Sequence, residues 1–110
     1  MGKAEYWQRG ETLDYKNTGT AIIEANTVVI FGNRIGVAGT DILPGEVGSL
    51  HVTGVFEMTK TASGAVEMGT DVYFDGSGIT DTEGDGTVPA GYAAQAAAAG
   101  DTVILVKLTG

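Results

Sequence analysis

Cysteine is absent from this sequence of 110 residues, and histidine occurs once. Without cysteine the chain has no disulfide, no thiolate metal ligand and no thiol nucleophile. General acid–base catalysis usually recruits histidine or a tuned carboxylate. The single histidine, His51, lies in a segment of alternating residues with Thr53 and Glu57 on its face, as is typical of a surface strand. A Gly-x-Ser-x-Gly turn is also missing, so we expect no catalytic residue and no enzyme.

Basic residues are scarce: 6 Lys and Arg stand against 14 Asp and Glu, for a net charge of −8. The imbalance is concentrated in residues 61–110, where Lys107 is the one basic residue among seven acidic ones. Phosphate binding needs clustered lysine and arginine, and anionic membranes attract the same residues. We therefore expect neither nucleic acid nor a membrane surface as a partner.

Long apolar runs are lacking as well, since no stretch approaches the roughly 18 residues of a membrane span. The N-terminus carries charge from Lys3 to Glu11 without an apolar run, unlike a signal peptide. The glycine-rich segments do not match the phosphate-binding spacing G-x-x-x-x-G-K-[ST]. We expect no cofactor.

An acidic run is the one candidate for a metal site. Asp81, Glu83 and Asp85 are spaced like the first ligands of a calcium loop, and Gly86 follows them. The position that should supply a bidentate glutamate holds Tyr92 instead. We interpret the run as a solvated acidic loop, with weak divalent-cation binding as the alternative.

Among the patterns that the sequence does contain, alternation of residues with a period of two is the most frequent. In residues 49–58, Leu50, Val52, Phe56 and Met58 share one face, as in a half-buried strand. Residues 102–108 are apolar on both faces over most of their length, which indicates an interior strand or one that faces a partner subunit. Shorter candidate strands are residues 20–24, 26–31, 35–38 and 71–74.

Turn residues separate these runs every 8 to 15 residues, a spacing that favours an all-β barrel or sandwich of short antiparallel strands. The alanine-rich residues 93–99 could form a strand or a short helix, and we favour the strand because so short a helix is marginal in water. We expect an arm at residues 1–15 and a single β domain at 16–110, with an acidic loop at 75–89.

Large aromatic residues gather near the N-terminus, outside any obvious strand. Tyr6, Trp7, Arg9 and Tyr15 are residue types that dominate interface energies. Two interpretations remain open: Trp7 caps one end of the barrel, or the segment is a docking arm.

The order of short segments resembles the tailed-phage capsid cement family of small head decoration proteins. The likeness begins at Tyr6-Trp7-Gln8 and extends over most of the chain to residue 108. Its segments are residues 6–15, 23–29, 34–38, 44–48, 52–57, 69–75, 91–93 and 98–103. Some members of this family carry a recombinase label, which the missing nucleotide loop and the acidic charge do not support.

This resemblance implies an all-β, β-tulip-like protein that is made in the bacterial host cytoplasm and reinforces the phage head from its outer surface. The implied partners are the major capsid protein and further copies of the chain, as a trimer. We expect capsid binding through Tyr6, Trp7, Arg9 and Tyr15. The alternative is a binding module for a carbohydrate or a host surface, displayed from the virion. For the oligomer interface the small or apolar candidates are Ala96, Ala98, Val103 and Leu105.

Overall fold

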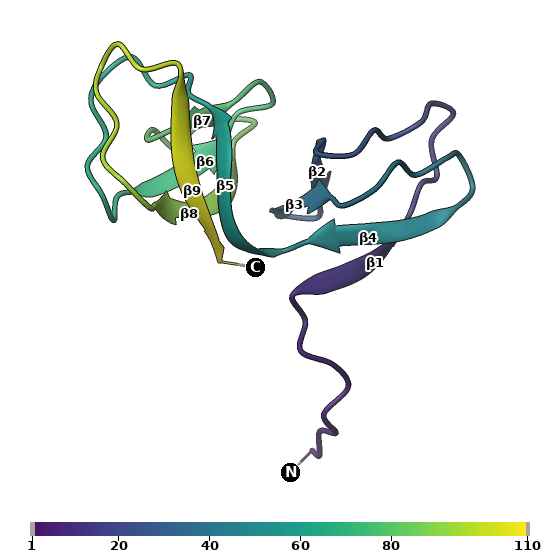
Figure 1. Cartoon of the computed structure of the whole chain (residues 1–110). Coiled ribbons are helices and arrows are strands. Elements are labelled where there is room, and N and C mark those ends of the chain that lie inside the picture. Colours follow the sequence, from purple (N-terminus) through teal and green to yellow (C-terminus); the bar gives the residue numbers. More distant parts are fainter. Residues whose placement is uncertain (1, 110) are drawn as a thin grey trace.

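The computed structural model describes residues 2–109, which form nine strands and no helix (Figure 1). The strands are β1 (Thr12–Lys16), β2 (Val28–Phe31), β3 (Arg34–Ala38), β4 (Val47–His51), β5 (Thr53–Thr59), β6 (Asp71–Phe74), β7 (Ile79–Thr80), β8 (Val88–Ala93) and β9 (Val103–Thr109). The expected all-β class is confirmed, whereas the specific β-tulip arrangement stays a prediction. No helix among residues 2–109 has the length and apolar character needed to cross a membrane.

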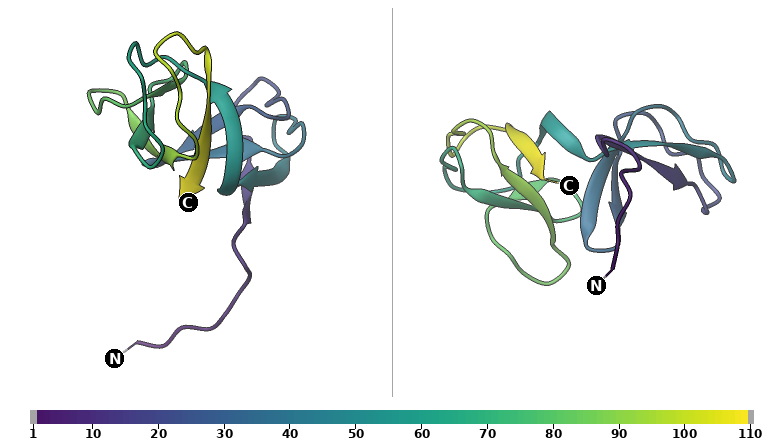
Figure 2. Two further views of the ribbon diagram at one scale, coloured as in Figure 1. Left: turned by 60° about the vertical axis from the view of Figure 1, so that its left-hand side comes forward. Right: turned by 90° about the horizontal axis from the view of Figure 1, so that it is seen from below.

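Two antiparallel sheets lie side by side in the molecule (Figures 1 and 2). The first sheet has the order β1-β4-β3-β2, and the second has the order β5-β9-β8-β6-β7. Strands β4 and β5 are separated only by Val52, so the chain passes from one sheet to the other almost without a break. Residues 49–58, whose alternation predicted one strand, therefore serve both sheets.

The second sheet curls into a half-barrel. Lys60, the residue after β5, forms a parallel bridge with Ile79 of β7 at the far end of the strand order. The curl is tight because glycine allows backbones to approach closely. At Gly91, with φ of 151°, a β-carbon would collide with the Lys107 carbonyl oxygen of β9. At Gly78 a β-carbon would lie 2.6 Å from the Thr59 carbonyl oxygen of β5.

The main hydrophobic core lies inside this half-barrel. Strand β9 runs between β5 and β8 and buries Ile104, Val106 and Leu108 on one face. Ile35 and Val37 of β3 reach into the same core from the first sheet. A second, smaller cluster in the first sheet consists of Val29, Ala38 and Leu50. The first sheet therefore contributes Ile35 and Val37 to the core of the half-barrel and keeps a small cluster of its own.

The strand expected at residues 93–99 is wrong, and the helix alternative is absent there too. Strand β8 ends at Ala93, and beyond it only Ala97 pairs, in an isolated bridge to Val66. The Ala94 N–H donates to the Leu105 carbonyl, and the Ala97 N–H donates to the Val66 carbonyl. These backbone groups bond to distant strands and loops, which leaves them unable to make the local bonds of a helix.

The strand expected at residues 20–24 is also wrong, since only Ile23 bridges there, to Ile42. The buried Asn17 side chain explains the difference. Its amide donates to the Ala21 carbonyl at 2.8 Å and to the Ile42 carbonyl at 2.9 Å. An asparagine side chain that bonds backbone in this way competes with a regular ladder, so the segment is held as a loop.

The boundaries expected for the arm and the acidic loop fall on structured elements. Strand β1 begins at Thr12, so the last four residues of the expected arm pair with β4. The expected acidic loop at 75–89 contains β7 and the first residues of β8. Met1 and Gly110, at the outer ends of the two expected segments, lie outside the described residues.

Candidate functional site

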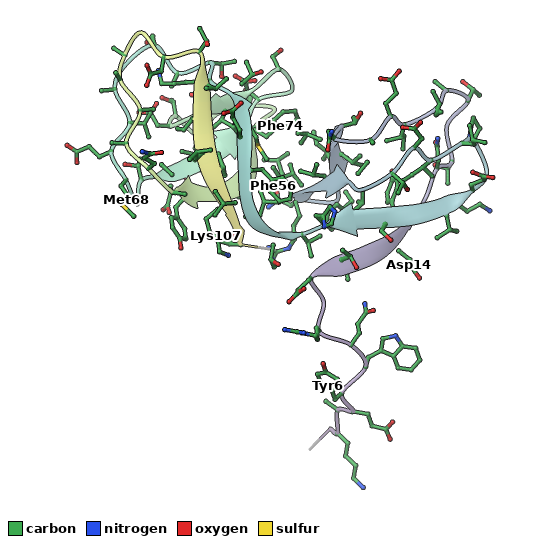
Figure 3. All side chains as sticks on the ribbon, viewed as in Figure 1. Tyr6, Asp14, Phe56, Met68, Phe74 and Lys107 are labelled. Carbon is green, nitrogen blue, oxygen red and sulfur yellow. The ribbon has the colours of Figure 1, made fainter. Side chains whose placement is uncertain are left out.

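The N-terminal arm, residues 2–10, lies apart from both sheets and contains no strand (Figure 2). Tyr6 is 81 % exposed and Trp7 is 90 % exposed, and Figure 3 places Tyr6 well away from the body of the molecule. Arg9 forms an ion pair with Glu11 at 3.4 Å, with both side chains in solvent. Trp7 therefore does not cap a barrel in the isolated chain, and the arm presents its aromatic side chains to solvent.

Tyr15 is separated from these three residues by its place in β1. Its side chain is half-buried and packs against the small cluster of Val29, Ala38 and Leu50. The structure thus brings Tyr6, Trp7 and Arg9 together on the arm and assigns Tyr15 a packing role in the first sheet.

The candidate oligomer residues lie close together on the second sheet. Ala96, Val103 and Leu105 line one shallow cleft of about 280 Å³, together with Glu57 and Gln95. Ala98 does not line this cleft but is exposed in the same loop as Ala96. The outward face of β9 that carries Val103 and Leu105 is therefore a partly apolar surface within reach of another subunit.

The candidate metal residues Asp81, Glu83 and Asp85 are all exposed. Their loop is held by threonine: the Thr82 N–H donates to the Thr80 hydroxyl, and the Gly84 N–H donates to the Thr87 hydroxyl. Among residues 2–109 no three His, Cys, Asp or Glu side chains are grouped closely enough to hold a metal ion.

A second cleft, of about 270 Å³, was not expected from the sequence. It lies where the half-barrel meets the first sheet, and its apolar lining comes from Val28, Val37, Phe56, Met58 and Phe74. Phe56 and Phe74 both lie on the side of the second sheet that faces the first (Figure 3). These residues belong to four different strands, so no local sequence pattern could have brought them together.

A tight turn holds one rim of this cleft. The Asp75 carboxylate accepts hydrogen bonds from the N–H groups of Ser77 and Gly78, both at 2.9 Å, and from the Thr61 hydroxyl at 2.6 Å. The Thr61 bond is the largest of several contributions that lower the pKa of the Asp75 carboxyl below its usual value of 3.8. The ionised form of Asp75 therefore stabilises the turn that positions Ser77 and Gly78 beside the cleft.

Lys60 is a buried basic residue that the sequence analysis also missed. Its ammonium group donates to the Ala62 carbonyl at 2.7 Å and to the Ala99 carbonyl at 3.4 Å. A signal for its burial was present, because Lys60 continues the even-numbered face of Phe56 and Met58. Its contacts tie two loops to the end of β5, which is a structural role.

Comparison with known proteins gives one result. The sequence model for phage cement proteins matches residues 7–108. Neither the curated proteins nor the solved structures give a significant match. The matched range begins at Trp7 on the arm and covers both sheets.

Proposed function

This chain belongs to the phage cement protein family, and from that premise we propose that it attaches to the head as an oligomer through its exposed arm. The family resemblance indicated by the order of its short segments is confirmed. Cement proteins are structural and non-catalytic, and they stabilise the capsid of the virion. The details proposed here are the residues that make contact and the association of the copies.

The observation that carries the docking proposal is the exposure of Trp7, which is 90 %. A large aromatic side chain in solvent contributes nothing to the core, yet it can bury 150–250 Å² or so against a partner. Tyr6 and Arg9 are on the same short segment, and Trp, Tyr and Arg are the residue types enriched at binding hot spots. Ordering the arm on the capsid costs about 1–2 kcal/mol per residue in backbone entropy, which only large buried anchors can offset.

The test is a comparison of Trp7→Ala with the wild-type protein, measured on phage heads that lack it. We expect capsid binding to weaken by about 2 kcal/mol or more, which is about thirtyfold. The melting temperature should stay unchanged, because the side chain touches no core. Met68→Ala is the matched control, since Met68 is a large apolar residue that is 70 % exposed on a loop of the second sheet. Normal binding with a lowered melting temperature would show that Trp7 is a packing residue.

The proposed oligomer, a trimer by resemblance, uses the face of β9 that carries Val103 and Leu105, with Ala96 and Ala98 beside it. Val103 is 45 % exposed, and a self-interface is the simplest cover for this apolar face. Sedimentation equilibrium at micromolar concentration should give a mass above the 11.2 kDa of one chain. Leu105→Glu should lower that mass, because it introduces an unpaired charge into the interface. A wild-type mass of 11.2 kDa in free solution would contradict the proposal.

A further inference from the structure

Strand β5 is an edge strand of the half-barrel. It pairs with β9 on one side, and on its other side the described strands meet it only at its C-terminal end, where Lys60, the next residue, bridges Ile79 of β7. An unpaired edge presents a row of backbone N–H and C=O groups to any extended chain that approaches it. The unexpected cleft of about 270 Å³ lies on this open side, because its lining includes β5, β2 and β3 but no residue of β8 or β9.

The register of β5 identifies which backbone groups face outward. The Lys60 N–H donates to the Thr102 carbonyl at 2.9 Å, which continues the β5–β9 ladder. Inter-strand bonds alternate along an antiparallel strand. The backbone N–H and C=O groups of the even-numbered residues of β5 therefore bond to β9, and those of the odd-numbered residues point away from β9. Thr59 is covered, since Gly78 lies against its carbonyl oxygen. Val55 and Glu57 remain as open positions for an added strand.

The cleft beside these positions suits a side chain better than a free ligand. Small-molecule pockets usually span about 300–1,000 Å³, and this cleft falls below that range. Its lining combines the apolar side chains already named with polar groups of Asn26, Thr59 and Ser77, and Glu57 is the one charged residue among those that line it. With the net charge of −8 on the whole chain, the site favours a neutral or basic segment that carries a large apolar side chain.

We propose that the open edge of β5 binds an extended segment of the major capsid protein as an added strand. The backbone of that segment pairs with Val55 and Glu57, and one of its large apolar side chains enters the cleft beside Phe56 and Phe74. The proposal rests on the proposed function for the identity of the partner. It gives the chain a second point of attachment, on the opposite side of the β4–β5 ribbon from the arm. The arm leads into β1 through Glu11, whose carbonyl accepts a hydrogen bond from the Val52 N–H. Glu11 and β9 both lie along that other edge.

The decisive variant is Glu57→Pro, because proline removes an outward N–H while leaving the bonds to β9 in place. We expect binding to protein-free phage heads to weaken about tenfold or more, since a partner carbonyl is left without its donor. Glu57→Gln is the matched control: it keeps the N–H and removes only the charge, so its binding should weaken less than about threefold. Equal losses for the two variants would overturn strand addition.

A second variant, Val28→Phe, places a ring in the cleft without changing any residue of β5. It should also weaken head binding about tenfold, by excluding the incoming side chain. This result decides the matter if circular dichroism shows that Glu57→Pro does not fold. Normal binding by Val28→Phe would then overturn the proposal.

The outcomes separate this inference from the proposed function. If wild-type protein and Glu57→Pro bind heads equally while Trp7→Ala does not, the arm proposal stands and strand addition falls. If Glu57→Pro lowers the sedimentation mass and leaves the head affinity per subunit unchanged, the occupant is a second copy of the chain, and the capsid assignment is wrong. If wild-type protein fails to bind heads at all, both proposals fall.

Discussion

The two sheets bury apolar surface in different ways although both are antiparallel. The half-barrel encloses a core that includes Ile104, Val106 and Leu108, whereas the four-stranded sheet has only Val29, Ala38 and Leu50 at the centre of its own cluster. A small sheet with so few buried side chains has little to offset the entropy of ordering its chain. Ile35 and Val37 extend from it into the larger core. The first sheet therefore depends on the second for much of its stability.

The largest expected effect is that of Leu108→Ala, compared with Leu50→Ala. Both leucines are 1 % exposed, so the two changes differ in their surroundings and not in chemistry. We expect Leu108→Ala to lower the free energy of unfolding by about 2–5 kcal/mol, because it leaves a cavity in the enclosed core. Leu50→Ala should cost less, because the open cluster around it can collapse. Urea unfolding followed by far-UV circular dichroism measures both, and equal losses would remove the distinction between the sheets.

A smaller effect is expected for Ile35→Val, which trims one methylene from the contact between the sheets. The loss of stability should be about 0.5–1.5 kcal/mol. Native-state hydrogen exchange should show faster opening mainly in β2 and β3, because the half-barrel retains its own core. Ile30→Val is the control, since Ile30 lies on β2 but is 44 % exposed. Uniform acceleration across both sheets would instead mean that they unfold as one unit.

The smallest effect concerns Asp75, whose pKa is lowered by the hydrogen bond from Thr61 and by backbone donors. A carboxyl whose pKa is lower in the folded protein than in the unfolded chain stabilises the fold at pH values above its unfolded pKa. This contribution is lost as the pH falls through the folded pKa. Asp75→Asn should therefore lower the melting temperature slightly at neutral pH, and the deficit should shrink below pH 3.8. Exposure to solvent keeps the effect small. Asp85→Asn, at an exposed position that accepts none of these bonds, is the control variant for the loss of a surface charge.

Local alternation was enough to predict much of the strand content. The inward face of Leu50, Val52 and Met58 is confirmed, and β9 is an interior strand as expected. The same alternation could not show that the run divides between two sheets at Val52, because the division depends on which distant strands pair with each half. Residues 20–24 and 93–99 were mispredicted for a related reason. There, a buried asparagine side chain and single backbone bridges take the place of a ladder.

Of the candidate surfaces, too, some could be predicted from the sequence and one could not. The aromatic arm was visible in the sequence because Tyr6 and Trp7 stand in a polar stretch without strand alternation. Tyr15 looked equivalent, but its position in β1 turns it toward the first-sheet cluster. The cleft near Phe56 and Phe74 was invisible, because it exists only where separate strands converge. Residue type predicts exposed anchors, whereas a concave surface requires the fold.

The position of Trp7 has a spectroscopic consequence. It is the only tryptophan of the chain, and it is attached to the arm and not to the core that melts. Its indole is already solvated in the folded protein, so its emission maximum will move little when the sheets unfold. Burial against the capsid would shift that emission to the blue. The chain thus carries an intrinsic fluorophore whose emission reports attachment to the head and changes little on denaturation.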